Sequence, residues 1–208
     1  YGLKYIDEDG MGYKCKKYKV KYPPQEQKEQ PGMEYLMEPR PIFYNPEYKA
    51  SGKLKDKVAI ITGGDSGIGR AVSILFAKEG ASVVIPYYNE HRDALETKYY
   101  IEKIGGKCLL LCGDIKDENF SKTIVRETLN EFGKIDILVN NAGVQYQQKS
   151  LLDITEEQFD KTLKTNVYGM FYLTKEALKY MHSGASIINV SSITTFYGEP
   201  ELIDYVTS

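Results

Sequence analysis

From residue 58 onward, the hydrophobic positions follow two alternating patterns. Short, nearly continuous apolar runs are each followed by a longer stretch in which apolar residues recur at every third or fourth position. The short runs predict buried strands, and the recurring positions predict amphipathic helices. The predicted strands are 58–62, 82–87, 107–112, 135–140 and 185–191, and the predicted helices are 67–78, 92–103, 118–132 and 155–181.

This alternation of strands and helices predicts a parallel sheet that helices cover on both faces, because apolar strands of this kind are buried on both sides. Right-handed connections then give an α/β doubly wound sheet, the three-layer α/β/α arrangement of the Rossmann fold. In such a sheet the ligand binds at the carboxyl ends of the strands.

Residues 1–52 follow neither pattern and contain six of the eight prolines of the chain. We expect an extended N-terminal arm here, and a Rossmann domain over 53–208. The arm carries apolar side chains such as Leu36, Ile42 and Phe43. They are too numerous for a solvated tail, so we expect the arm to lie along its own domain or along a partner subunit.

Lysines and tyrosines interleave over residues 13–22, which is compatible with a nucleic-acid patch or with a charged, edge-like or disordered segment. The acidic residues Asp7, Glu8 and Asp9 offset this charge, and the net charge of the chain is −2. We therefore expect no nucleic-acid partner.

Other global features narrow the class of protein. The 42% of hydrophobic residues suffices for a core, and no apolar run reaches the length of a membrane span. Three cysteines, an odd number, argue against a disulfide framework and for a reducing, cytoplasmic setting. With two histidines in the chain, we assign no metal.

The segment from Thr62 to Gly69 lies between the first predicted strand and the first predicted helix. Its glycines would allow a tight turn off the strand, close approach of the backbone to a ligand, and close packing of the helix on the sheet. Free N–H groups at the start of the helix would face a diphosphate. A tight turn without a ligand is the alternative. The segment reads Thr62, Gly63, Gly64, Asp65, Ser66, Gly67, Ile68, Gly69.

Small and polar residues also follow the later strands. Asp114 follows the third strand, Asn140 ends the fourth, and Ser192 follows the fifth. Each has a structural alternative as a helix cap, a turn or a strand end. Together they gather at one edge of the sheet, which favours a binding site there.

These motifs resemble the short-chain dehydrogenase/reductase family in order and spacing. The resemblance covers residue 53 to the end of the sequence, and the arm is similar to a bacterial general-stress or glucose/ribitol dehydrogenase-like branch. The family motifs are Thr62-Gly-x-x-x-Gly67-Ile-Gly69, Asn140-Asn-Ala-Gly143, Asn166, Ser192, and Tyr205 thirteen residues later; those of the arm are Pro23-Pro24-Gln25, Gln30-Pro31-Gly32 and Leu36-Met37.

The resemblance implies hydride transfer between a nicotinamide cofactor and a small carbonyl or secondary alcohol substrate, such as a ketone, sugar or polyol. It implies that Tyr205 is the general acid/base, that Ser192 binds the reacting oxygen, and that Asn166 breaks the long helix and holds a water. A homo-oligomer, a dimer or tetramer, is also implied. The implied cofactor-binding residues are Thr62, Gly63, Asp65, Ser66, Gly67, Ile68, Gly69, Tyr87, Asn89, Asp114, Ile115, Asn140, Ala142 and Gly143.

The sequence departs from the family at its end. The family signature is Tyr-x-x-x-Lys, and the sequence stops at Ser208, one residue before the lysine that would lower the pKa of Tyr205. We expect a piece of a longer, active enzyme that lacks the last strands. The alternative is a short, inactive protein that binds the cofactor. A methyltransferase also carries a glycine turn, but the spacing of Ser192 and Tyr205 argues against it.

The sequence leaves the choice between NAD and NADP open. The position after the second strand, where an acid would bind ribose hydroxyls, falls at Tyr87, with Tyr88 and Asn89 after it. The cations that could approach a 2′-phosphate, or could be solvated, are Arg70, His91 and Arg92. Substrate contacts are expected from 144–146 and 193–203, unless the aromatic residues there pack the loop.

Overall fold

A computed structural model describes residues 4–6, 13–15 and 23–208. Its centre is a five-stranded sheet in which all neighbouring strands pair in parallel. The strand order is β5-β4-β3-β6-β7, so the chain starts in the middle and winds outward in both directions. This order confirms the predicted doubly wound fold. The strands are β3 (Val58–Ile61), β4 (Ser82–Tyr87), β5 (Cys108–Cys112), β6 (Ile135–Asn140) and β7 (Met181–Asn189).

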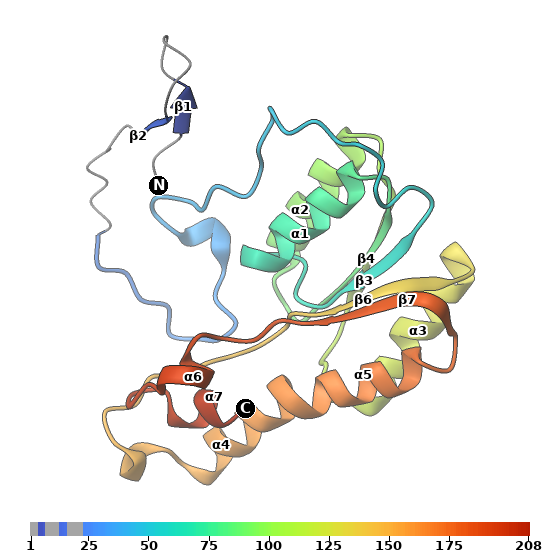
Figure 1. Ribbon diagram of the computed structural model, residues 1–208. Helices are drawn as coiled ribbons and strands as arrows, with labels where there is room; N and C mark the ends of the chain where they lie inside the picture. The colour runs from blue at the N-terminus through green and yellow to red at the C-terminus, as the bar shows by residue number, and fades with distance from the viewer. Residues whose placement is uncertain (1–3, 7–12, 16–22) are drawn as a thin grey trace.

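Helices cover both faces of the sheet, as the apolar strands require (Figure 1). On one face lie α1 (Gly67–Lys78) and α2 (His91–Lys103), and on the other lie α3 (Glu118–Phe132), α4 (Glu156–Leu163) and α5 (Gly169–Ala177). Successive residues of β3 serve the two layers in turn: Ile61 belongs to the core with α1 and α2, and Ile60 to the core with α3 and α5. This alternation follows from the two-residue period of a strand.

The predicted long helix 155–181 is interrupted and ends early. A π-helical turn, Lys164–Tyr168, separates α4 from α5, so the predicted local break at Asn166 is confirmed. The predicted end at Met181 is wrong, because α5 ends at Ala177 and Met181 already pairs with Ile135 in the sheet. A register shift between Ile135 and Ile137 accommodates the early start of β7. The sequence pattern placed the end of this helix too late, because apolar residues in the turn between α5 and β7 continue the spacing that is typical of a helix.

The chain between β6 and α4, and the chain after β7, contain short elements. A 3₁₀ turn, Leu151–Asp153, precedes α4. After β7 come α6 (Thr194–Tyr197) and α7 (Ile203–Thr207), which lie at the end of the molecule where α4 begins (Figure 1).

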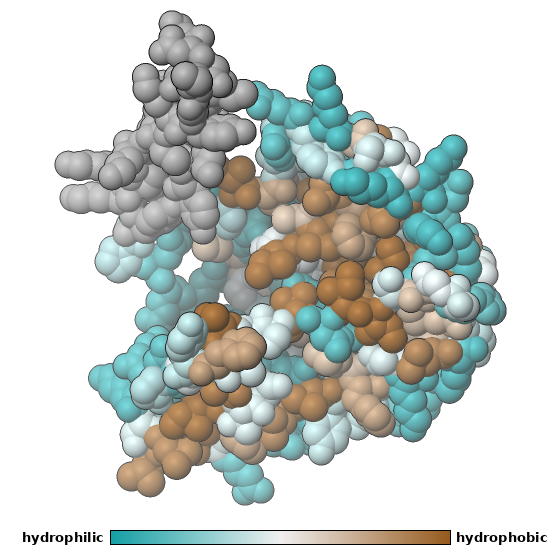
Figure 2. Space-filling model, in the orientation of Figure 1, coloured by the Kyte–Doolittle hydropathy of each residue, from teal (hydrophilic) through white to brown (hydrophobic). Residues whose placement is uncertain are grey.

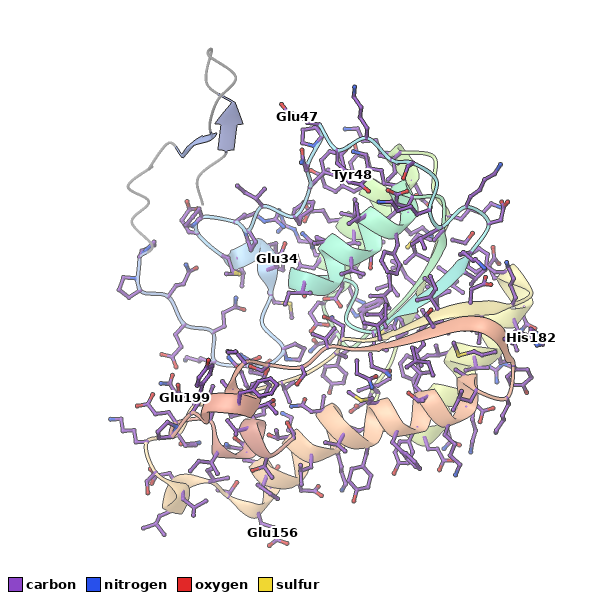
Figure 3. All side chains as sticks on the ribbon, in the orientation of Figure 1. Glu34, Glu47, Tyr48, Glu156, His182 and Glu199 are labelled. Atoms are coloured by element: carbon purple, nitrogen blue, oxygen red, sulfur yellow. The ribbon has the colours of Figure 1, made fainter. Side chains whose placement is uncertain are left out.

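The N-terminal arm lies along its own domain, which confirms one of the two predicted arrangements. Over 23–57 it contains one 3₁₀ turn, Glu34–Leu36, and no strand. Phe43 packs edge-on against Tyr100 of α2 with ring centroids 5.1 Å apart. Further along, Glu79 at the end of α1 accepts hydrogen bonds from Tyr48 and from the backbone of Ser51 and Lys53 (Figure 3).

Two short segments in the first part of the arm pair with each other. Strands β1 (Lys4–Ile6) and β2 (Tyr13–Cys15) form a small antiparallel sheet. The rest of the lysine- and tyrosine-rich run, 16–22, lies outside the described residues.

The surface on the β7 side of the molecule is apolar (Figure 2). Ile187, Ile188 and Val190 are 38%, 44% and 37% exposed, although they belong to or follow a strand of the central sheet. Within the described part of the chain, none of the helices combines the length and the apolar character needed to cross a bilayer.

Candidate functional site

A cleft opens at the carboxyl ends of the strands, where the sequence predicts the binding site. Four neighbouring strands contribute the residues that directly follow or end them: β3, β4, β5 and β6. Nine of the residues implied as cofactor-binding line this one cleft: Thr62, Gly63, Asp65, Ser66, Tyr87, Asp114, Ile115, Ala142 and Gly143.

The Thr62 hydroxyl joins the glycine turn after β3 to the turn after β6. Its oxygen accepts hydrogen bonds from the backbone N–H groups of Asn141 and Ala142, both at 2.9 Å. The Asn141 amide donates in return to the Thr62 carbonyl at 2.9 Å. The two turns are therefore fixed to each other before any ligand binds.

Two glycines of the turn show why glycine is needed there. A Cβ atom on Gly69 would lie 2.1 Å from the Gly63 carbonyl oxygen, so any side chain would push α1 away from the turn. Gly67 has a φ of +52°, and a Cβ there would meet nothing within 4 Å. Gly69 therefore permits close packing of α1 on the turn, and Gly67 adopts a left-handed backbone conformation that other residues rarely take.

Asp65 gives the glycine turn an unusual acidic group. It is 3% exposed, and no cation pairs with its carboxylate among the described residues. Burial, together with the nearby charge of Glu90, raises the pKa of Asp65 to about 7. Glu90 is itself 3% exposed and lines the cleft, twenty-one residues after Gly69. Dinucleotide folds carry the acid that binds the ribose hydroxyls at about this distance.

The three residues that the sequence analysis considered for a phosphate have different partners in the structure, and none of them lines the cleft. Arg70 is fully buried and pairs with Glu34 at 2.5 Å and with Asp93 at 3.1 Å. His91 Nδ1 lies 3.0 Å from the Tyr87 hydroxyl. The guanidinium of Arg92 lies 4.3 Å from the ring centroid of Tyr35. The expectation of a solvated Arg70 is wrong, because the arm covers it.

Asn166 holds the turn after β6. Its Oδ1 accepts from the Val144 N–H at 2.8 Å, and its Nδ2 donates to the Val144 carbonyl at 3.0 Å. Nδ2 also donates to the Ser208 hydroxyl at 2.9 Å, and that hydroxyl donates to the Tyr205 carbonyl at 2.8 Å. The structure thus connects Asn166 to the backbone of Tyr205 through one intervening side chain.

Ser192 and Tyr205 come from the two segments that follow β7. The Ser192 hydroxyl accepts from Thr194 Oγ1 at 3.0 Å, and Tyr205 lies in α7, which packs on α4. Both side chains are partly exposed. In the described part of the chain no hydrogen bond joins Ser192 to Tyr205, although both come from the segment that follows β7.

The comparison with known families identifies this arrangement. The model of the short chain dehydrogenase family matches residues 57–208, which include Asn166, Ser192, Tyr205 and all residues lining the cleft except those from the arm. The chain belongs to the short chain dehydrogenase family.

Its relatives support the predicted branch. The chain is 58% identical to the oxidoreductase YhxC of Bacillus subtilis (strain 168) over 183 residues, which cover 88% of the chain and 64% of that protein. It is 52% identical to general stress protein 39 of the same organism over 191 residues, 92% of the chain and 67% of that protein. It is 40% identical to the glucose and ribitol dehydrogenase of Daucus carota over 193 residues, 90% of the chain and 66% of that protein. The chain therefore spans about two thirds of the length of these relatives.

Solved structures of short chain dehydrogenases share the fold. One from Burkholderia cenocepacia J2315, in complex with NADP, superposes with a TM-score of 0.72 at 31% identity and covers 74% of this chain and 63% of its own. A putative short-chain alcohol dehydrogenase from Sinorhizobium meliloti 1021 gives a TM-score of 0.71 at 30% identity, over 76% of this chain and 62% of its own.

The other residues expected in the cofactor site of this short chain dehydrogenase lie outside the lining of the cleft. Gly67, Ile68 and Gly69 begin α1, and Ile68 is 66% exposed. Asn89 is exposed after β4. The Asn140 amide donates to Thr174 at 3.0 Å and to Asn189 at 2.9 Å, so it ties β6 to α5 and β7.

Several lining residues were missed by the sequence analysis. Asn141 lies within the quoted Asn140–Gly143 run, so its signal was present. Tyr88 was named after β4 without a role, and the acid Glu90 lies three residues beyond Tyr87, where the family's acid position was expected. The arm also supplies Gln30 and Pro31, and no sequence pattern indicated that a segment so far from the glycine turn would reach it.

The segments expected to contact a substrate are tied to each other. Gln147 donates to the Glu201 carboxylate, and the Gln148 N–H donates to the Glu201 carbonyl at 2.9 Å. Phe196 and Tyr197 are each 83% exposed, so the alternative that these aromatic residues pack the loop is wrong.

Proposed function

We propose that the protein is an NAD- or NADP-dependent oxidoreductase that transfers a hydride between the nicotinamide cofactor and a carbonyl or secondary alcohol carbon. The observation that supports this most is the single cleft at the carboxyl ends of β3 to β6, lined by nine residues of the expected cofactor set in a chain of this family. The chemistry of the lining agrees with a dinucleotide, because polar backbone of the glycine turn meets apolar side chains such as Ile115 and Phe120.

The residues of the cleft would contact the cofactor along its whole length. The glycine turn with Ser66 would face the diphosphate, and Asp114 with Ile115 would contact the adenine. Ala142 and Gly143 would line the path toward the nicotinamide. When bound, the nicotinamide ring supplies or accepts the hydride.

Three side chains would manage the proton and the reacting oxygen. The Tyr205 phenol would donate its proton to the carbonyl oxygen in reduction, or accept the alcohol proton in oxidation. Ser192 would donate a hydrogen bond to the same oxygen and hold it in place. Asn166, fixed on Val144 by two hydrogen bonds, would keep the π-helical turn open for a water in the proton path. A free phenol has a pKa of about 10, so a nearby cation would be needed near neutral pH.

A small ketone, sugar or polyol is the proposed substrate. Among the relatives, one is named for glucose and ribitol, and another, from Arabidopsis thaliana at 40% identity, is named an NADPH-dependent aldehyde reductase. Exposed aromatic and polar residues of 194–199 would offer a shallow contact surface for such a molecule. A homo-oligomer stays a prediction.

The experiment that tests the proposal compares turnover with binding. Oxidation of NADH and NADPH is followed at 340 nm with a panel of small aldehydes, ketones and sugars, using the protein as its gene encodes it. Tyr205→Phe should lower kcat by about 10²- to 10⁴-fold while the Kd for the cofactor stays within about twofold. Tyr99→Phe, at an exposed position of α2 outside the cleft, is the matched control and should be active.

Three outcomes have distinct meanings. Turnover that depends on Tyr205 supports the proposal. Cofactor binding without turnover on any substrate supports the alternative of an inactive, cofactor-binding protein. An active Tyr205→Phe variant would show that the assignment of the acid/base is wrong.

A further inference from the structure

The arm reaches the cleft at one short loop, residues 27–33. Gln27 closes this loop, because its side-chain amide donates to the Met33 carbonyl at 2.9 Å and its Oε1 accepts from the Met33 N–H at 2.7 Å. Gln30 and Pro31 lie at the far end of the loop and line the cleft together with Asp65, Tyr87 and Glu90. The loop therefore has its own internal hydrogen bonds, which fix its conformation.

Glu34, directly after the loop, attaches the arm to the start of α1 (Figure 3). It is 3% exposed, and one carboxylate oxygen accepts from the Gly67 N–H at 2.5 Å. The other oxygen pairs with Arg70 NH1, also at 2.5 Å. The arm therefore uses a backbone donor of the glycine turn itself, the same element that would face the cofactor.

Arg70 connects this attachment to the inside of the glycine turn and to α2. Its Nε donates to the Asp65 carbonyl at 2.8 Å, and its NH2 donates to the Asp93 carboxylate at 3.1 Å. Asp93 in turn accepts from the N–H groups of Glu34 at 2.8 Å and Tyr35 at 3.1 Å. All three charged side chains are almost completely buried, so each would be costly to leave without its partner.

The position of Gln30 points to the adenosine half of a dinucleotide. The ends of β4 and of the glycine turn are the places where this fold binds the adenosine ribose, and Gln30 lines the same cleft as residues from both. Its side-chain amide makes no hydrogen bond within the described residues, so its donors and acceptor are available. A carboxamide can donate to and accept from vicinal hydroxyl groups at the same time.

We propose that loop 27–33 is part of the dinucleotide site, with Gln30 as a hydrogen-bonding residue for the adenosine half and Glu34 as the residue that positions the loop. This inference rests on the proposed function, since it concerns the same cleft. It assigns to the arm a role in cofactor binding rather than in oligomerisation or in binding another macromolecule.

Binding of three probes separates this role from a structural one. Isothermal titration calorimetry measures the Kd for NADH, for ADP-ribose, which lacks the nicotinamide, and for reduced nicotinamide mononucleotide, which lacks the adenosine. Gln30→Ala and Glu34→Gln should each weaken binding of NADH and ADP-ribose by about five- to tenfold, the effect of one lost hydrogen bond. Their affinity for the mononucleotide should equal that of the unmodified protein.

Glu38→Gln is the matched control, because Glu38 lies exposed on the same arm and the change removes the same charge. It should leave all three affinities unchanged. Gln30 is itself exposed and makes no contact that folding requires, so Gln30→Ala keeps the test valid if Glu34→Gln proves unstable.

The possible failures are distinguishable. Affinities like those of the unmodified protein in both variants would overturn this inference while the proposed function stands. Equal weakening of all three probes would also overturn it, since the arm would then act on the fold as a whole. If the unmodified protein binds neither NADH nor ADP-ribose, the proposed function fails, and this inference with it.

Discussion

The side chain of Asn166 and the backbone of Val144 hold each other by two hydrogen bonds, at 2.8 Å and 3.0 Å. Asn166 comes from the π-helical turn and Val144 from the segment after β6, so this pair joins the break in the long helix to the cleft. A residue expected for its role in a proton path is therefore also a structural tie.

Replacement of Asn166 should reveal both roles. Asn166→Ala leaves the Val144 N–H and carbonyl without partners, so the free energy of unfolding should fall by about 1–3 kcal/mol. Urea denaturation measures this loss. Lys164→Gln, at an exposed position of the same turn, serves as the control and should change stability by less than about 0.5 kcal/mol. A stable Asn166→Ala variant would show that the two hydrogen bonds are not needed for the turn.

Asp65 should make the stability of the protein depend on pH. The pKa of Asp65 is about 7 in the folded protein, whereas the ordinary value for an aspartate, expected in the unfolded chain, is 3.8. Between these two pH values the folded protein holds a proton that the unfolded chain has released. Stability should therefore fall as pH rises from about 4 to about 7, by a few kcal/mol at most, and then level off. Free energies of unfolding at several pH values measure the slope.

Asp65→Asn should remove this slope, because the amide does not titrate. Glu90→Gln should move the slope to lower pH, since the charge of Glu90 is the second cause of the raised pKa. Parallel stability profiles for Asp65→Asn and the unmodified protein would contradict the assignment.

The cleft should prefer NAD to NADP. Two buried acids, Asp65 and Glu90, line it, while Arg70 is engaged in ion pairs behind the glycine turn. Above about pH 7, where Asp65 has lost its proton, a 2′-phosphate near these carboxylates would be repelled, and we expect a Kd for NADP at least about tenfold higher than that for NAD. Glu90→Gln should bring the Kd for NADP closer to the Kd for NAD. Tighter binding of NADP, the cofactor of the related Burkholderia structure, would refute the prediction.

Removal of the Arg70 guanidinium should destabilise the fold strongly. Arg70→Met leaves the buried carboxylates of Glu34 and Asp93 without their partner, at an expected loss of about 3–5 kcal/mol. Arg126→Met removes a guanidinium that is 61% exposed and pairs with Glu127, and should cost at most about 1 kcal/mol. Thermal unfolding of the two variants side by side provides the measurement.

The sequence predicted the sheet and the glycine turn well because both depend on local patterns. Buried strands such as Val58–Ile61 are continuous apolar runs, and the glycines mark the turn by their chemistry. The doubly wound arrangement followed from the general handedness of βαβ connections. The site at the strand ends could be placed for the same reason.

The arm and the end of the long helix could not be predicted because they depend on tertiary contacts. Glu34 meets Gly67, thirty-three positions further along the chain, and nothing in either local sequence specifies the pair. Arg70 looked like a charge on a helix surface, since only the arm makes its side of α1 an interior. After α5, residues 178–181 carry apolar side chains at all positions but Lys179 and fit a helix as well as a strand, and the pairing of Met181 with Ile135 decides between them.

The burial of Arg70 bears on how the chain can be divided. A boundary near residue 52 separates two kinds of sequence, yet Glu34 on one side completes the ion pairs of Arg70 and Asp93 on the other. We therefore expect that residues 53–208 are not an autonomous folding unit. Chimeras that exchange the arm between relatives should be designed as replacements of core residues, with Glu34, Arg70 and Asp93 transferred as one set.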